Sequence, residues 1–305
     1  MLKVTFLGTG GSLPTTNRNP SAIAIQREGE LILFDCGEGT QQQMMRAKTG
    51  MMRLTSIFVT HFHADHILGI PGLIQTMSFQ GRKEPLVIYG PKKMREFGSV
   101  MLKMGYYNLT FNIDFVEMEP GTEIDFGEYV VRAIKTDHGI PSIGFALIEK
   151  ERLGRFKKAI ALELGVPEGR LFGRLQRGEA VTVDGITITP DQVLGPPRPG
   201  RKIVYSGDTR PCDGIRNISQ GADLLIHDSS LADDMAEWAQ ESRHTTAGEA
   251  AKLALDAGVR KLVLTHISSR YSESTKPLEE CAKKIYSNAI VAEDLMSIEI
   301  PLRDE

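Results

Sequence analysis

Short apolar runs of strand length recur along the chain, separated by segments with helical periodicity. Their mix of continuous and alternating apolar character predicts buried strands at 4–8, 31–36, 55–60, 86–89, 129–134, 203–205, 224–226 and 262–264. The helical spacing predicts helices at 39–47, 92–103, 247–257 and 278–286, with Thr245 and Thr246 as caps of the third. The pattern therefore predicts an α/β protein built of sheet and helix layers.

Five of these strands end on histidine or aspartate, in SIFVTHFH, AIKTDHG, IVYSGDT, LLIHDS and LVLTHIS. Loops at one end of a sheet are where α/β architectures assemble their sites. The strand ends are therefore the predicted position of the functional site.

Composition and charge describe an ordinary globular chain of 305 residues with 41% hydrophobic content and a formal net charge of −3. The charge gives no global sign of a nucleic-acid binder, so any basic patch must be local. Three cysteines (Cys36, Cys212, Cys281) are too few and too far apart for a disulfide framework. They favour a reducing cytoplasm, and the absence of an apolar leader or a membrane-length apolar window predicts no membrane association.

One stretch differs from the rest in charge. Residues 150–202 carry eleven Lys or Arg against six Asp or Glu, a net charge of +5 within a chain of −3. Its glycine and proline spacing, including GPPRPG at 195–200, predicts a protruding arm at 151–200 inserted in a single domain of residues 1–305. Taken alone, most such charge runs are solvated insertions without a ligand.

The strongest chemical signal is the run Thr60-His61-Phe62-His63-Ala64-Asp65-His66 after a predicted strand. Side chains two apart in an extended segment point the same way, so His61 and His63 are placed to bind one metal ion together. Asp65 and His66 follow at the turn and are placed to face a second ion. A lone histidine on a strand is usually a core residue, but four ligand-type residues in six positions favour a zinc site open to water.

The run HxHxDH, followed by His138, Asp208 and His266 at later strand ends, resembles the motif set of the metallo-β-lactamase superfamily. The resemblance implies an αββα four-layer sandwich with two Zn²⁺ ions per subunit, manganese being the alternative metal. It places His61, His63 and His138 on one ion and Asp65, His66 and His266 on the other. It also implies that Asp208 bridges the two ions and that Asp65 orients the attacking water.

Segments along nearly the whole chain resemble the ribonuclease Z family in particular. They are FLGTGGSLPT at 6–15, FDCGEGTQ at 34–41, THFHADHILGIPGL at 60–73, GRLFGRLQRGE at 169–179, GPPRPGRKIVYSGDT at 195–209 and HISSRY at 266–271. The resemblance implies a zinc-dependent endoribonuclease that removes the 3′ trailer of precursor tRNA. It further implies a homodimer whose arm, with Arg174 and Arg177, contacts tRNA.

Two further segments depart from the family pattern. His244 with Thr245 and Thr246 resembles the HST loop, which implies that His244 donates a proton to the leaving 3′ oxygen. HDSS at 227–230 occupies the position of the family's HEAT motif. The resemblance implies that Asp228 orients His244, with a side chain one methylene shorter than the family's glutamate.

The loop PTTNRN at 14–19 has Thr16 where the family often has lysine, which leaves the treatment of the CCA end open. Arg18, Asn19 and Arg270 are the predicted RNA contacts in this part of the chain.

Rival interpretations make different demands on these residues. A metallo-β-lactamase-like phosphodiesterase or esterase for a small substrate would not need the basic arm. A non-catalytic tRNA-binding module would not need seven metal ligands, and a redox diiron protein would favour a carboxylate-rich second site.

Overall fold

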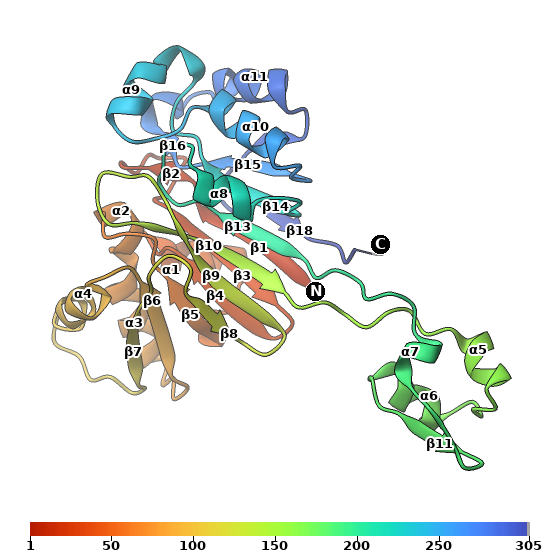
Figure 1. Cartoon of the computed structure of the whole chain (residues 1–305). Helices are drawn as coiled ribbons and strands as arrows, with labels where there is room; N and C mark the ends of the chain where they lie inside the picture. The colour runs from red at the N-terminus through yellow and green to blue at the C-terminus, as the bar shows by residue number, and fades with distance from the viewer. Residues whose placement is uncertain (304–305) are drawn as a thin grey trace. The chain divides into compact units, whose positions relative to one another are not determined.

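The computed structural model describes residues 1–303 and divides the chain into two compact units. The larger unit contains residues 1–148 and 202–301. The smaller unit contains residues 149–201 together with Leu302 and Arg303. Figure 1 shows the elements of both.

The first sheet of the larger unit has seven strands among the described residues. Its order is β18 (Ser297–Glu299), β1 (Leu2–Gly8), β3 (Ala22–Arg27), β4 (Glu30–Phe34), β5 (Leu54–Phe58), β6 (Leu86–Gly90), β7 (Ile113–Glu117). Strand β1 is antiparallel to β18 and β3, and β4 to β7 run parallel. The parallel strands direct their following loops to one edge.

The second sheet also has seven strands within residues 1–303. Its order is β17 (Ala289–Val291), β15 (Leu262–Thr265), β14 (Leu224–Asp228), β13 (Lys202–Tyr205), β10 (Ile143–Glu149), β9 (Tyr129–Lys135), β8 (Glu123–Asp125). Strands β13, β14, β15 and β17 are parallel neighbours, so their carboxyl ends share one edge.

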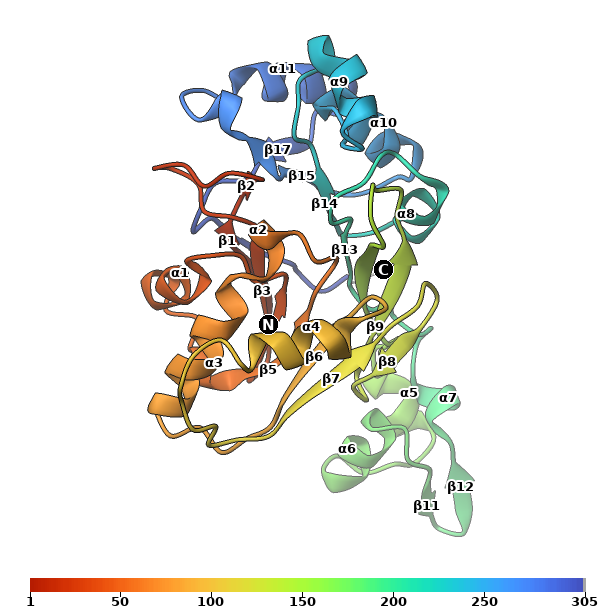
Figure 2. The same cartoon turned by 90° about the vertical axis from the view of Figure 1, so that its left-hand side faces the viewer.

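Helices cover the outer faces of both sheets, as Figures 1 and 2 show. The first sheet carries α1 (Thr40–Ala47), α3 (Gly69–Phe79) and α4 (Met94–Met101). The second carries α8 (Asp213–Ile218), α10 (Ala247–Asp256) and α11 (Lys276–Ile285). Two shorter helices, α2 (Ala64–Ile67) and α9 (Ala236–Glu241), lie next to the loops described below. The layers are helix, sheet, sheet and helix.

The alternation of side chains along the strands explains this layering. In β14, Leu224 and Ile226 belong to the core between the sheets, whereas Leu225 packs in the core beneath the helices. Stacked aromatic rings join the two sheets: Phe34 lies 5.5 Å from Phe145 and 5.9 Å from Tyr205 between ring centroids. Both faces of each sheet are therefore buried, as the continuous apolar runs predict.

The smaller unit has its own fold. It contains α5 (Lys158–Glu163), α6 (Arg170–Gln176), α7 (Pro190–Val193) and the hairpin of β11 (Val181–Val183) and β12 (Ile186–Ile188). A small apolar cluster holds it together, consisting of Ala161, Val166, Leu175, Val181, Ile188 and Val193. Arg201 forms a buried bidentate ion pair with Glu149, with both N–O distances 2.7 Å. The segment predicted as a protruding arm thus has a small packed core of its own.

The eight predicted strands and four predicted helices all occur, with most boundaries displaced by one or two residues. Strands β3, β7, β10 and β17 are not among those predicted. Strand β10 follows a proline in PSIGFALIE, and its apolar run is interrupted by Gly144. Within residues 1–303, no helix combines the length and apolar character needed to cross a bilayer.

Candidate metal centre

The strand ends converge as the sequence predicts. The described residues contain three neighbouring groups with ligand atoms within 4.8 Å of one another. Two hold the predicted ligands, namely His61, His63, His138 and Asp208, and Asp65, His66 and His266, and the third consists of Asp208, Asp228, His244 and His266. They come from the segment after β5, from α2, and from the loops after β9, β13 and β15. All seven predicted ligand residues therefore lie together, although the chain brings them from positions 61 to 266.

The first group is formed by three imidazoles. His61 Nε2 lies 2.9 Å from His63 Nδ1, and His138 Nε2 lies 3.4 Å from the same atom. In the second group, Asp65 Oδ2 lies 3.3 Å from His266 Nε2 and 3.5 Å from His66 Nε2. Each group offers nitrogen and oxygen atoms of the kind that zinc prefers.

Asp208 lies between the two groups. Its Oδ2 is 3.6 Å from His61 Nε2, 3.4 Å from His66 Nε2 and 3.2 Å from His266 Nε2. The other carboxylate oxygen, Oδ1, is buried without a hydrogen-bond partner, and so is His66 Nε2. A buried acceptor without a donor is costly, and a divalent cation would satisfy both atoms. The residues present therefore fit a divalent metal.

A buried carboxylate, Asp35, orients two of these histidines. It accepts hydrogen bonds from His66 Nδ1 at 2.8 Å and from the Thr60 hydroxyl at 2.9 Å. Because the Thr60 hydroxyl proton is used in this way, its oxygen accepts from His61 Nδ1 at 2.9 Å. The Nε2 lone pairs of His61 and His66 are thereby directed toward the metal centre.

Asp228 plays the same part from the second sheet. Its Oδ1 accepts from the Ser230 hydroxyl at 2.8 Å, and the Ser230 oxygen in turn accepts from His266 Nδ1 at 2.9 Å. Its Oδ2 lies 2.8 Å from His244 Nδ1. The alternation in β14 explains the placement, because Asp228 follows Ile226 on the inner face of the sheet.

The contact with Asp228 gives His244 an unusual charge state. Although burial of the ring opposes protonation, the neighbouring Asp228 carboxylate raises the pKa of His244 to about 9. The histidine is therefore protonated at neutral pH and aimed by its Nδ1 hydrogen bond. An aspartate at this position reaches the ring despite its shorter side chain.

The loop after β1 closes another side of the centre. The backbone N–H of Ser12 donates to Asp65 Oδ2 at 2.8 Å. Gly11, in β2 (Gly10–Gly11), pairs in parallel with β16 (Ile267–Ser268), and a Cβ at Gly11 would lie 2.5 Å from His266 Nδ1. Only glycine allows this loop to approach His266 so closely.

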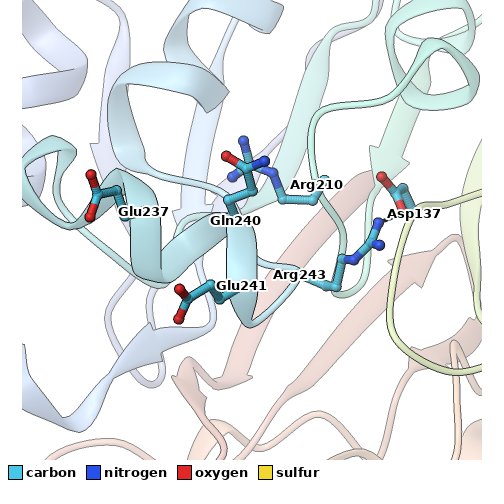
Figure 3. Close-up of a pocket in the computed structure, with 6 residues that line it drawn as sticks. All are labelled: Asp137, Arg210, Glu237, Gln240, Glu241 and Arg243. Atoms are coloured by element: carbon cyan, nitrogen blue, oxygen red, sulfur yellow. Dashed lines mark hydrogen bonds and ion pairs between the residues drawn. The ribbon is translucent and has the colours of Figure 1, made fainter.

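A cavity of about 720 Å³ adjoins this region and is drawn in Figure 3, lined by Asp137, Arg210, Glu237, Gln240, Glu241 and Arg243. Arg243 donates to Asp137 Oδ1 at 2.8 Å, and its carbonyl accepts from His138 Nδ1 at 3.2 Å. Arg210 donates to the His244 carbonyl and forms an ion pair with Glu249. The two arginines thus connect the loops that carry His138 and His244.

Comparisons with known proteins match this architecture. Ribonuclease Z of Methanosarcina acetivorans is 64% identical over 305 residues, covering 100% of both chains. Ribonuclease Z of Gemmatimonas aurantiaca is 48% identical and covers 100% of this chain and 98% of its own. The chain belongs to the ribonuclease Z family. As a member, it is a metal-dependent endoribonuclease, which confirms the predicted family, fold class and enzyme class.

One solved structure of a tRNase Z, other solved structures of the same fold, and two family models also match the chain. The human tRNase Z short form is 32% identical, with a TM-score of 0.70 over 98% of this chain and 100% of that one. The metallo-β-lactamase-fold protein YhfI of Bacillus subtilis is 20% identical with a TM-score of 0.70, over 98% of this chain and 100% of its own, a likeness of fold. The model of a beta-lactamase superfamily domain matches residues 176–267, and that of the anti-Pycsar protein Apyc1 matches residues 2–154.

The residues that resemble RNA contacts of the ribonuclease Z family lie in different surroundings. Arg18, predicted to contact RNA, is instead buried: its guanidinium donates to Thr9 Oγ1 at 2.7 Å and to the Ala292 carbonyl at 2.6 Å. Its charge anchors the 9–20 loop inside the fold. Asn19 is half-buried and Arg270 is exposed.

Arg174 and Arg177 are exposed in the smaller unit, where both pair with Glu179. Sequence reasoning missed Asp35 and Ser230 as supports of the centre. The first carries the same signal as the predicted ligands, because it is an acidic residue at the end of a strand run.

We expect Asp228→Asn to return the pKa of His244 toward the ordinary imidazole value, about 6.5. The substitution keeps the side-chain size and removes the charge that favours the imidazolium. An NMR titration of the His244 ring protons in both proteins measures the change. An unchanged pKa would show that Asp228 does not set the charge of His244.

The same shift has a consequence for stability. Because the folded-state pKa of His244 lies above its unfolded value, its stabilising contribution is complete below about pH 6.5. It is lost as the pH rises through about 9. Asp228→Asn should therefore flatten this part of the pH dependence of urea unfolding.

Proposed function

We propose that this protein cleaves the 3′ trailer from precursor tRNA and leaves a 3′-hydroxyl on the tRNA. The observation that carries the proposal is the full-length identity of 64% to a ribonuclease Z, combined with a strand-end centre suited to two metal ions. The related human protein of known structure is a tRNase Z, short form. Hydrolysis of a phosphodiester is the chemistry that such a centre favours.

We assign His61, His63 and His138 to one Zn²⁺ and Asp65, His66 and His266 to a second, with Asp208 shared by both. When bound, such ions supply a nucleophile near neutral pH and neutralise the charge of the phosphodiester. The ligand set contains no thiolate, so it also suits Mn²⁺. The identity of the bound metal therefore has to be measured.

The proposed proton movements use two residues of the chain. Asp65, held by the Ser12 N–H at 2.8 Å, orients the attacking water. His244, protonated through its contact with Asp228, gives its proton to the 3′ oxygen that leaves. The phosphorus–oxygen bond to the tRNA breaks as the bond to water forms, so the trailer retains the phosphate.

The decisive test is incubation of the purified protein with a precursor tRNA that carries a labelled 3′ trailer. We expect metal-dependent cleavage at the discriminator base or after CCA, lost on chelation and lowered by at least about a thousandfold in Asp65→Ala. Elemental analysis of the same preparation should find two zinc ions per chain. Intact RNA with hydrolysis of a simple bis-phosphodiester would favour a small-substrate enzyme instead.

We also propose that the smaller unit binds tRNA through its basic surface. Arg174 and Arg177 are exposed, and Glu179 is their shared partner. Replacing both by alanine should raise KM for precursor tRNA and leave kcat unchanged. The slope of log binding constant against log salt concentration should fall by about one unit per lost phosphate contact. Glu179→Gln is the matched control, because it frees both arginines for phosphate. Equal KM values in all three proteins would contradict the proposal.

We propose a homodimer formed through the helix layer of the first sheet. This layer and its adjoining loops expose large apolar side chains, namely Met45, Leu68, Phe79, Val100, Met104 and Tyr106. Large exposed apolar patches mark protein–protein interaction sites. Sedimentation should give twice the 33.7 kDa chain mass, and Phe79→Asp with Tyr106→Asp should halve it. A single-chain mass for the unmodified protein would exclude the dimer.

We infer a cytoplasmic location for this enzyme. The three cysteines are free, as in proteins of a reducing compartment, and precursor tRNA is the proposed substrate. Cell fractionation tests the inference directly.

A further inference from the structure

A second, smaller cavity of about 270 Å³ lies beside the metal centre. Three segments line it: residues 11–13 of the loop after β1, residues 230–244 around α9, and residues 266–270 after β15. His244 and His266 are among its lining residues, so whatever occupies this cavity lies next to the atoms proposed to react.

Trp238 is the unusual member of this lining. Half of its surface, 50%, is exposed, and within residues 1–303 its indole ring takes part in no ring stacking and no hydrogen bond. Its neighbour Ala239 is the fully buried residue of the same helix, whereas Trp238 leaves half of its surface open. A large aromatic side chain left open beside a reaction centre is suited to a ligand.

Helix α9 presents different chemistry to the two cavities. Trp238 and Ser242 line the smaller one, whereas Glu237, Gln240 and Glu241 line the larger one drawn in Figure 3. The lining of the smaller cavity contains no aspartate or glutamate among the described residues. An anionic nucleotide therefore meets no acidic side chain on the lining of this cavity, in contrast with the larger cavity.

Two further side chains complete the site. Leu13, 62% exposed on the loop after β1, adds a second apolar surface. Arg270 is an exposed cation on the same lining, and its guanidinium is suited to a phosphate group. An aromatic platform, an apolar side chain and a cation together match a base with its attached phosphate.

We propose that this cavity binds one unpaired nucleotide adjacent to the scissile phosphodiester, with its base stacked on Trp238 and its phosphate at Arg270. The inference rests on the proposed function, since it names the part of the RNA that this side of the centre receives. Stacking accepts every base, so the cavity would select a single-stranded junction rather than a sequence.

Trp238 is the single tryptophan of the chain, which makes its fluorescence a direct probe of the cavity. Precursor tRNA is titrated into Asp65→Ala, which keeps the RNA uncut, and into the unmodified protein on ice with calcium. We expect a base stacked on the indole to quench its emission. A series of substrates is then used, each lacking the base at a different single position around the cleavage site. Only the substrate that lacks the base stacked on Trp238 should bind without quenching. Equal quenching by all of them would overturn the proposal.

Kinetics give an independent measurement. Trp238→Ala should raise KM for precursor tRNA by roughly 5- to 100-fold with little change in kcat, because stacking is made in the ground state. Trp238→Phe, which keeps a ring, should recover part of the loss. Leu255→Ala, an equally exposed substitution on α10, is the control and should leave KM unchanged.

The outcomes separate this inference from the proposed function. If the unmodified protein cleaves precursor tRNA but Trp238→Ala has the KM of the control, the nucleotide site is wrong and the tRNA function stands. If the unmodified protein cuts no precursor tRNA and the RNA does not quench Trp238, both are overturned.

Discussion

Two buried carboxylates determine how four histidines of the centre are oriented. Asp35 of the first sheet holds His66 directly and His61 through Thr60, and Asp228 of the second sheet holds His244 directly and His266 through Ser230. Each contact fixes one ring nitrogen as a donor. Asp35 also accepts from Tyr205 at 2.8 Å, so the contact that orients a ligand also joins the two sheets. The order of the centre therefore depends on correct packing of the sandwich.

This dependence explains which parts of the site are visible in the sequence. The ligands follow strands, and strand ends are found from apolar runs, so His61, Asp208 and His266 are predictable as a set. The supporting contacts are not, because they join residues far apart in the chain: Tyr205 lies 170 residues from Asp35. Arg18 shows the same limit, since its carbonyl partner is 274 residues away, whereas the resemblance of its loop to the family implied an RNA contact. Burial is decided by tertiary packing, which no local pattern contains.

The smaller unit shows a different limit of sequence reasoning. Glycine and proline spacing indicates loops, and residues 150–202 contain both at high frequency. The apolar residues that form its core, such as Val166, Leu175 and Val193, are spaced too irregularly to predict one helix or strand. They meet only because three short helices and a hairpin fold together. A cluster of this size adds little stability. At the ends of this segment, Glu149 and Arg201 neutralise each other's charge where both are buried.

Charge distribution reconciles an acidic chain with an RNA substrate. The net charge is −3, yet residues 150–202 carry +5. At physiological ionic strength the screening length is about 8 Å, so an approaching phosphate responds to nearby groups rather than to the sum over the chain. Divalent cations at the centre would offset Asp65 and Asp208, while Asp35 and Asp228 lie buried beneath the ligands. The larger cavity is lined by three carboxylates and two arginines, whereas the lining of the cavity of Trp238 and Arg270 contains no carboxylate among the described residues. In the proposed nucleotide site the RNA lies on the Trp238 side of α9, which is why the indole is the side chain to probe.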